Sequence, residues 1–421
     1  HYQTANSFPA MRGLLLCAGA LAAAPAYALR PRLQESADAS RGSPGGYYWP
    51  SGHGRNGDYG NSPYVGPKDL KSSFAWSWHH PGGRFHTLPY GSAIDDKKNI
   101  YLTTDSSIWK ISENGTTIWS FYPKPKGTIF SAGSLLDGRI HFTTTDCRVF
   151  AVSMETGEEI WSNKACKNIN YDNSFTAAYD GVVIAALGAE KRATRGGQNI
   201  ANENVSAFSA VDGRLLWTYK PPQALWNFMG LFPGDGTVLY QDLEGRGYRN
   251  RLSDGKLLWK AGGSPLSWTD GTATLAVGVL YTVSAYTTLP PPFGGVLRAH
   301  RVGDGALQWE AKVPMPPNNA PAVGRLPGRS SLSVVQPGGY QGKKGGQTGI
   351  YAFDAGTGKL QWSFTGPPQK EVRQAGDVEG RRERVAAGAT SGYVTNPWSA
   401  ATIDADGTVY AGHEDGLFFA L

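Results

Sequence analysis

Cysteine and methionine are scarce in this chain of 421 residues, which contains three of the first and four of the second. Charged residues make up only 18% of the sequence, and no long apolar run or sustained helical period occurs. The lack of a long apolar run argues against a membrane-spanning helix, and the lack of a helical period argues against a helical bundle. Glycine (55 residues), proline (27) and aromatic residues (12%) are plentiful instead, which suits turns and strands. The composition therefore predicts an all-β protein.

Short motifs of common catalytic sites are also absent. The sequence has no Gly-x-Ser-x-Gly, no phosphate-binding P-loop, no His-Glu-x-x-His and no pair of adjacent cysteines. The formal charge of +6 is spread over separate loops, without a basic helix or an aromatic RNA-binding strand. We therefore do not expect a nucleic-acid partner.

One pattern recurs along the chain: a strand, a turn that contains glycine, and a closing tryptophan. Clear copies are AVSMETGEEIW at residues 151–161 and AFDAGTGKLQW at 352–362. The tryptophans follow one another at intervals of 42 to 56 residues, the size of a four-stranded propeller blade. Asp-Gly and Thr-Gly between alternating runs are typical of hairpin turns. The closing tryptophans are Trp119, Trp161, Trp217, Trp259, Trp309 and Trp362.

Both ends of the repeat region carry part of one further repeat. Residues 72–80 (SSFAWSWHH) form a tryptophan strand without strands before it, and residues 416–421 (GLFFAL) form a third strand without a tryptophan strand after it. Pairing the two would complete a blade and cover its exposed edges. We predict a seven-bladed β-propeller of four-stranded antiparallel blades, closed by pairing N- and C-terminal strands. Eight blades are the alternative.

The repeats resemble the pyrroloquinoline-quinone (PQQ) repeat, whose docking motif runs Ala-x-Asp-x-x-Thr-Gly-x-x-x-Trp. Ala352, Asp354, Thr357, Gly358 and Trp362 match that motif throughout. The resemblance covers roughly residues 47–421, including the lead-in WPSGHGRNGDYGNSPYVGP. It is a resemblance to PQQ-like propellers of the quinoprotein alcohol dehydrogenase-like superfamily. It implies that each repeat tryptophan is a structural docking element between neighbouring blades.

The resemblance also raises the question of a quinone-dependent enzyme. Quinoprotein dehydrogenases share an adjacent-cysteine disulfide over the cofactor, a Ca²⁺ held by Glu, Asn and Asp, and a catalytic Asp. This chain has no adjacent cysteines, and no acidic cluster offers the six to eight oxygens that Ca²⁺ takes. We therefore assign no catalytic, cofactor-binding or metal-binding residue. We expect a non-enzymatic binding or scaffolding module, similar in kind to the bacterial lipoprotein propeller that assists outer-membrane barrel assembly. The alternative is a PQQ-dependent dehydrogenase with Ca²⁺ in an atypical site.

Three histidines lie at the end of the N-terminal tryptophan strand and just after it: His79, His80 and His86. Imidazoles so close together could bind Zn²⁺ or Cu²⁺. However, adjacent residues of a strand point to opposite faces, and no cysteine or carboxylate joins the group. We prefer to interpret this stretch as a loop that leaves the closing blade.

Aromatic residues stand just before the innermost strand of most repeats. Innermost strands line the central channel of a propeller, so these side chains would surround one mouth of the channel. They could bind a peptide strand, a carbohydrate or a ring-shaped small molecule there. Alternatively, they turn sideways into the packing between blades. The residues are Tyr90, Phe130, Phe175, Phe228, Trp268 and Trp398.

The N-terminal region is typical of an exported protein. From Met11 the chain reads MRGLLLCAGALAAAPAYA, with a positive start, a short apolar core and a small-x-small cleavage signal. We interpret residues 1–28 as upstream residues plus a secretory signal peptide, 29–46 as a flexible polar leader, and 47–421 as the propeller domain. The expected location is the secretory pathway, the extracellular space or the periplasm, with the plastid lumen as the alternative. We expect a monomer or part of a larger assembly.

Two cysteines lie beyond the signal peptide, Cys147 and Cys166. If residues 148–153 and 158–163 pair as a hairpin, residue 147 stands opposite residue 164, two positions from the second cysteine. An oxidising compartment then favours a disulfide. Two unlinked buried thiols are the alternative.

Overall fold

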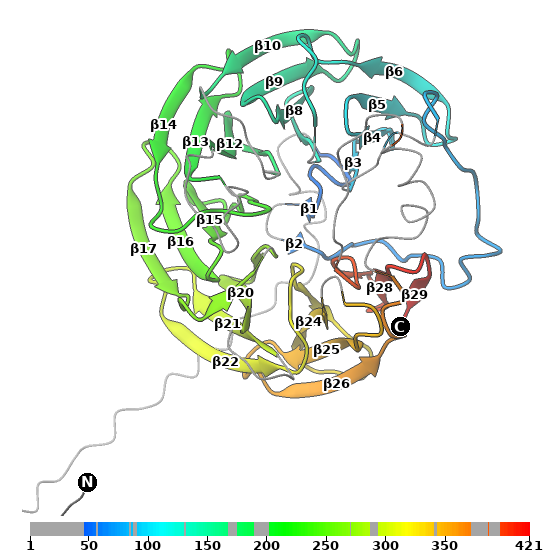
Figure 1. The fold of residues 1–421 in the computed structure, drawn as a ribbon, viewed down its shortest axis with the longest axis vertical. Helices are drawn as coiled ribbons and strands as arrows, with labels where there is room; N and C mark the ends of the chain where they lie inside the picture. The colour runs from blue at the N-terminus through cyan, green and yellow to red at the C-terminus, as the bar shows by residue number, and fades with distance from the viewer. Residues whose placement is uncertain are drawn as a thin grey trace, which may run out of the picture. The chain divides into compact units, whose positions relative to one another are not determined.

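Seven antiparallel β-sheets follow one another along the chain and stand as blades around a ring (Figure 1). This confirms the predicted all-β, seven-bladed propeller, and the eight-bladed alternative is wrong. Every element of two or more residues in the described part of the chain is a β-strand, and no helix there could cross a membrane.

The computed structural model describes residues 46–55, 58–83, 86, 91–129, 132–166, 175–188, 202–269, 271–286, 294–340, 343–371, 386 and 396–421.

The predicted signal peptide lies outside the described residues, as does the flexible leader except for Gly46, at its end. The described residues fall into one compact unit. A short hairpin of two strands, β1 (Gly54–Arg55) and β2 (Asp58–Tyr59), precedes the first blade.

The first three blades have four strands each, and consecutive strands pair antiparallel. Blade 1 contains β3 (Ala93–Ile94), β4 (Ile100–Thr103), β5 (Ile108–Ile111) and β6 (Thr117–Phe121). Blade 2 contains β7 (Ser134–Leu136), β8 (Arg139–Thr144), β9 (Arg148–Ser153) and β10 (Glu159–Lys164). Blade 3 contains β11 (Ala177–Tyr179), β12 (Val182–Leu187), β13 (Asn204–Ser209) and β14 (Leu215–Tyr219).

The other four blades contain three, five, four and three strands in turn. In blade 4, a bridge between Leu231 and Leu239 takes the innermost position. Blade 4 contains β15 (Thr237–Gln241), β16 (Arg246–Arg251) and β17 (Leu257–Gly262). Blade 5 contains β18 (Ser267–Trp268), β19 (Thr274–Ala276), β20 (Val279–Tyr286), β21 (Gly295–Arg301) and β22 (Leu307–Val313). Blade 6 contains β23 (Ala322–Arg325), β24 (Leu332–Gly339), β25 (Thr348–Asp354) and β26 (Leu360–Thr365), and blade 7 contains β27 (Thr402–Ile403), β28 (Val409–Gly412) and β29 (Phe418–Ala420).

A β-bulge precedes the closing tryptophan in the outer strands of blades 1 to 6. In blade 2, Glu159 and Trp161 pair with successive residues of β9, so Ile160 is the extra residue. A bulge bends its strand and re-aims the next side chain. It therefore helps to set the direction in which each tryptophan leaves its blade.

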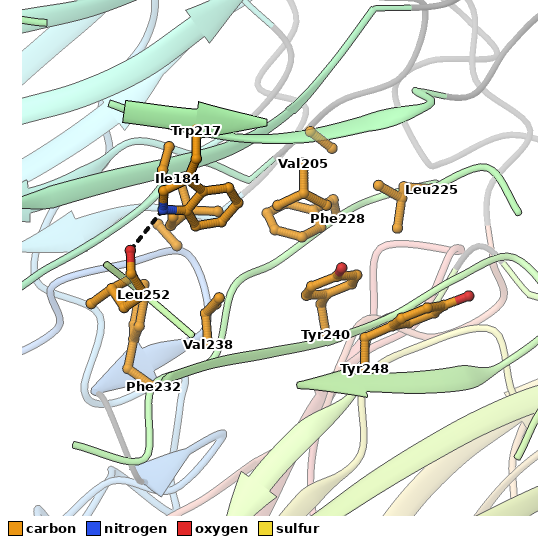
Figure 2. Packing of buried hydrophobic residues seen from close by; sticks show 13 residues of the cluster. Ile184, Val205, Trp217, Leu225, Phe228, Phe232, Val238, Tyr240, Tyr248 and Leu252 are labelled. Carbon is orange, nitrogen blue, oxygen red and sulfur yellow. Dashed lines mark hydrogen bonds between the residues drawn. The ribbon is translucent and has the colours of Figure 1, made fainter. Parts of the chain in front are cut away.

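The apolar core is divided into six clusters, each of which joins two consecutive blades. Figure 2 shows the cluster between blades 3 and 4, where Trp217, Phe228 and Tyr240 pack together. The Trp217 indole N–H donates to the carbonyl of Leu252 in the next blade, at 2.7 Å. Much of the apolar burial therefore takes place between the blades.

The closure between blades 7 and 1 differs from the prediction. Strand β29 pairs with β28 alone, and residues 72–80 form no strand in the described part of the chain. Instead, an earlier part of the lead-in pairs with β27 through a parallel bridge between Asn61 and Ile403. The chain then reaches blade 1, where the Trp76 indole N–H donates to the carbonyl of Glu113 at 2.8 Å. Side-chain docking holds residues 72–80 here, and the predicted strand ladder is not formed.

Candidate functional site

The lead-in to the first blade crosses the inner side of the ring, and Figure 1 shows β1 and β2 near its centre. Trp49 exchanges two backbone hydrogen bonds with Ile94 of blade 1, at 2.7 and 3.0 Å. The carbonyl of Pro50 accepts from Leu135 N of blade 2, at 2.7 Å. Gly52 packs against Phe175 at the start of blade 3, where a Cβ on the glycine would lie 3.1 Å from the ring.

The second half of the lead-in contacts the remaining blades. The Tyr59 hydroxyl accepts from the backbone N–H of Phe232 before β15, at 3.1 Å, and β2 packs against β19 of blade 5 and β23 of blade 6. The carbonyl of Gly60 accepts from Ile403 N of blade 7, at 2.9 Å. The described residues between 49 and 60 therefore contact all seven blades.

Burial controls the ionisation of the lead-in. His53 is buried, and this burial lowers its pKa to about 4, although a hydrogen bond with the backbone of Pro321 opposes the shift. Tyr59 is only 1% exposed, and burial raises the pKa of its hydroxyl. Both side chains are therefore neutral at pH 7 and form part of the packed interior.

The predicted mouth aromatics do not form an exposed ring among the described residues. Phe228 and Trp398 are each 2% exposed and belong to the clusters between blades 3 and 4 and between blades 6 and 7. Phe175 is half-buried against the lead-in, and Trp268 is half-buried with its ring 6.1 Å from that of Trp226. Tyr90 and Phe130 lie outside the described residues.

The repeat tryptophans link each blade to the next. The indole N–H groups of Trp119, Trp161, Trp217, Trp259 and Trp309 donate to backbone carbonyls of the following blade, at 2.7 to 3.2 Å. Trp362 packs in the cluster between blades 6 and 7. The sequence did not single out Trp76 as a docking residue, but its bond to Glu113 repeats this arrangement at the closure.

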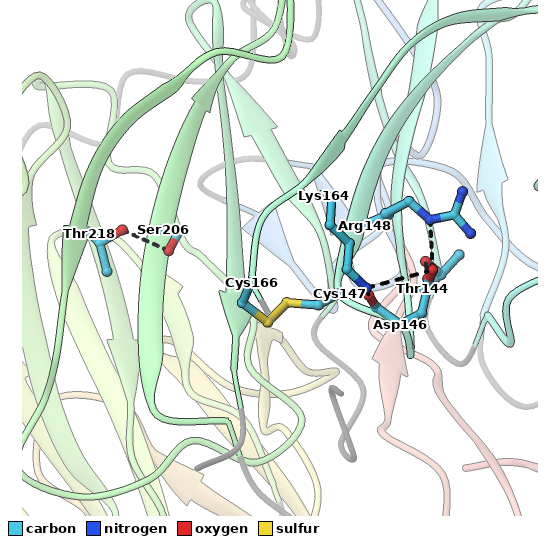
Figure 3. The surroundings of a disulfide bond; sticks show 8 residues. All are labelled: Thr144, Asp146, Cys147, Arg148, Lys164, Cys166, Ser206 and Thr218. Atoms are coloured by element: carbon cyan, nitrogen blue, oxygen red, sulfur yellow. Dashed lines mark hydrogen bonds and ion pairs between the residues drawn. A yellow bond between two sulfur atoms is a disulfide. The ribbon is translucent and has the colours of Figure 1, made fainter. Parts of the chain in front are cut away.

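The structure contains the disulfide between Cys147 and Cys166, which stands beside the outer strand of blade 2 (Figure 3). The bulge in β10 corrects the predicted register by one residue, because Ala165 N, and not residue 164, bonds to the Cys147 carbonyl at 2.9 Å. Asp146 strengthens the same corner through an ion pair with Arg148, at 2.7 Å. The disulfide therefore ties the start of β9 to the end of β10.

His80 and His86 come together, but with their rings stacked, the centroids 3.9 Å apart. His86 Nδ1 lies 3.1 Å from the carboxylate of Asp105. His79 is exposed. Across the described ranges, no three His, Cys, Asp or Glu side chains are grouped so that they could hold a metal ion.

A second histidine–carboxylate pair, which the sequence gave no reason to expect, lies in blade 7. His413 Nδ1 is 2.8 Å from Asp415, and both side chains are almost fully buried. Lys370 approaches the other oxygen of Asp415 at 3.1 Å. The His413 ring also packs edge-on against Trp398, with centroids 4.7 Å apart. This pair stabilises the junction between blades 6 and 7.

Known structures share this fold. A family profile described as outer membrane protein assembly factor BamB matches residues 200–343. The structure of BamB from Moraxella catarrhalis is 16% identical, with a TM-score of 0.50 over 78% of this chain and 86% of that one. A europium-containing methanol dehydrogenase is 11% identical, with a TM-score of 0.57 over 86% of this chain and 81% of that one.

Sequence relatives point to the same repeat. The alcohol dehydrogenase (quinone) dehydrogenase subunit of Gluconobacter oxydans (strain 621H) is 29% identical over 28% of this chain and 17% of its own length. Its counterpart in Gluconacetobacter polyoxogenes is 28% identical over 28% of this chain and 18% of its own length. The match spans less than a fifth of these relatives. The chain is a seven-bladed β-propeller, and with the docking geometry above these likenesses support a relation to the PQQ-repeat β-propeller superfamily.

The described residues do not fit a quinone with Ca²⁺ at the centre of the ring. The buried side chains of His53 and Tyr59 stand in the segment that crosses it. No described carboxylate cluster offers the oxygen ligands that Ca²⁺ takes. We therefore derive no chemical step through such a group.

Proposed function

We propose that this protein is a non-enzymatic binding or scaffolding module for a protein or small ligand. The observation that carries the proposal is the path of the lead-in, because its described residues between 49 and 60 contact every blade. A propeller enzyme that binds its cofactor on the axis needs an open cavity there. Here strands β1 and β2 of the lead-in lie near the centre of the ring (Figure 1).

Protein binding is favoured by the likeness to BamB, which is described as an outer membrane protein assembly factor. Function lies in the site and not in the fold, so the likeness supports only the kind of role. The disulfide between Cys147 and Cys166 favours an oxidising compartment. We propose a periplasmic or extracellular location, and the relatives give no support to the plastid-lumen alternative.

A quinone-dependent oxidoreductase is the second candidate, favoured by the relatives named alcohol dehydrogenase (quinone). The two functions are separated by titrating the purified protein with PQQ and Ca²⁺ and following the quinone absorbance. The binding-module proposal expects no saturable change and no dye-linked oxidation of alcohols or aldoses. Stoichiometric quinone binding would overturn it. A pull-down with the purified propeller as bait, analysed by mass spectrometry and compared with a pull-down that uses a mutant bait, then identifies the partner.

A further inference from the structure

Two histidines meet at the point where the N-terminal chain lies on blade 1. The rings of His80 and His86 are stacked with centroids 3.9 Å apart and planes 26° apart. The Trp109 ring stands edge-on to His80 at 5.1 Å, and that of Trp78 does so at 6.0 Å. This cluster holds residues 76–83 and His86 against strand β5.

The hydrogen bonds of His80 require its neutral form. The backbone N–H of Gly82 donates to His80 Nδ1 at 2.9 Å, so that nitrogen must keep its lone pair. His80 Nε2 is buried and has no hydrogen-bond partner among the described residues. The neutral ring therefore carries its hydrogen on Nε2, and protonation would add a second hydrogen at Nδ1, which replaces the acceptor for Gly82 with a donor.

We propose that His80 is a pH-sensitive clasp, which holds residues 76–83 on blade 1 at neutral pH and releases them in mild acid. Protonation would break the bond to Gly82 and place a positive charge beside the His86 ring, which Asp105 holds at 3.1 Å. Histidine is the side chain whose charge changes in this pH range.

The surrounding charges agree with this direction. Burial and the neighbouring His86 lower the pKa of His80, while Asp105 opposes the shift. In the released segment the ring regains its ordinary pKa near 6.5. The released state therefore binds the proton more readily, and the attached state loses stability as the pH falls below that value.

Release would uncover an aromatic surface. Trp109 is 6% exposed and is covered by Trp78 and His80. The other links in this region are the bond from Trp76 to Glu113 and the bond from Trp78 to Thr117 Oγ1, at 2.8 and 3.0 Å. With the clasp open, only these two described side-chain bonds hold the segment. The clasp does not depend on whether the protein binds a partner or a quinone.

Hydrogen–deuterium exchange of the full chain tests the clasp. Peptides covering residues 74–83 are followed between pH 7.5 and 5.0, after correction for intrinsic exchange. Each pH unit of linked protonation changes an equilibrium by up to about tenfold, so protection of these amides should fall by about tenfold or more. Protection of β15 in blade 4, followed in parallel, reports the loss of global stability in acid and separates it from local release of residues 74–83.

His80→Asn keeps an acceptor for Gly82 but cannot titrate. In this variant, the local release of residues 74–83 should therefore no longer depend on pH. His79→Asn changes the exposed neighbour and should behave like the wild type. If His80→Asn is unprotected even at pH 7.5, His80→Phe keeps the ring packing and serves as the second non-titrating variant. Protection in the wild type that is constant from pH 7.5 to 5.0 overturns the clasp. So does a non-titrating variant that keeps the wild-type pH dependence.

Discussion

Trp161 of blade 2 and Gly213 of blade 3 are in direct contact, and the contact requires both residue types. The indole N–H donates to the Ala210 carbonyl at 3.1 Å, and a Cβ on Gly213 would lie 2.5 Å from Cε3 of the ring. The glycine also has a positive φ of 73°. The same contact pairs Trp76 with Gly115, Trp119 with Gly157, Trp217 with Gly255, Trp259 with Gly305, and Trp309 with Gly358.

Replacing Gly213 with alanine should therefore destabilise the protein through two effects. The left-handed backbone costs about 1–2 kcal/mol for a residue with a Cβ, and overpacking against Trp161 adds about 1–3 kcal/mol. Urea unfolding measures the sum. Gly138→Ala is the matched control, because Gly138 has the same φ of 73° but no atom within 4 Å of an added Cβ. Equal losses in the two variants would show that the tryptophan contact adds nothing.

The repeat made most of the fold predictable, because its signals return in every blade. The Asp-Gly turns at residues 137–138 and 180–181 adopt the expected positive φ at both positions. The bulge before each tryptophan has no such signal, since its extra residue is Ile118 in blade 1 but Gln308 in blade 5.

The sequence predicted less of the candidate site than of the fold. Phe228 and Trp398 precede inner strands as expected, but alternation along a strand does not show whether such a residue faces the channel or a neighbouring blade. The path of residues 49–60 occurs once in the chain, so no periodic signal reports it. Its spaced glycines, of which Gly52 and Gly60 permit close approach to neighbouring blades, were the available sign of this path.

Substitution of Val277 by asparagine should stabilise the protein by about 1 kcal/mol. Val277 is 69% exposed and has a φ of 48° in the turn with Gly278, a conformation that is unfavourable for a β-branched residue. The equivalent turns have aspartate there. Thermal unfolding of Val277→Asn reports the gain. Val211→Asn, at a similarly exposed valine without a positive φ, should give no gain. A similar gain there would show that replacing an exposed valine with a polar residue is stabilising whatever the backbone conformation.

Removing the disulfide with the double variant Cys147→Ser/Cys166→Ser should lower the free energy of unfolding by about 3 kcal/mol. The bond closes a loop with a sequence separation of 19 residues, and cross-links of this size restrict the unfolded chain by about that amount. Guanidinium unfolding of the wild type and the variant measures the loss. Reductant should bring the wild type to the level of the variant and leave the variant unchanged. Loss of stability in the reduced variant would point to an effect other than the bond.

Buried histidines should make the propeller sensitive to acid. Burial, with Arg139 nearby, lowers the pKa of His141 to about 3, and burial lowers that of His53 to about 4. Below about pH 6.5 the unfolded chain takes up these protons but the folded chain does not. The stability from each residue is therefore complete above pH 6.5 and is lost progressively as the pH falls toward its folded pKa.

His141→Phe isolates one of these contributions, because it keeps an aromatic ring against Trp161, whose centroid lies 5.6 Å away. Between pH 7.5 and pH 5, one such histidine costs on the order of 2 kcal/mol. The difference in unfolding free energy between these two pH values should thus shrink by about that amount in the variant. His79→Asn, at an exposed site, should keep the wild-type difference. A His141→Phe protein as acid-sensitive as the wild type would mean that His141 is protonated equally in the folded and unfolded states, contrary to its burial.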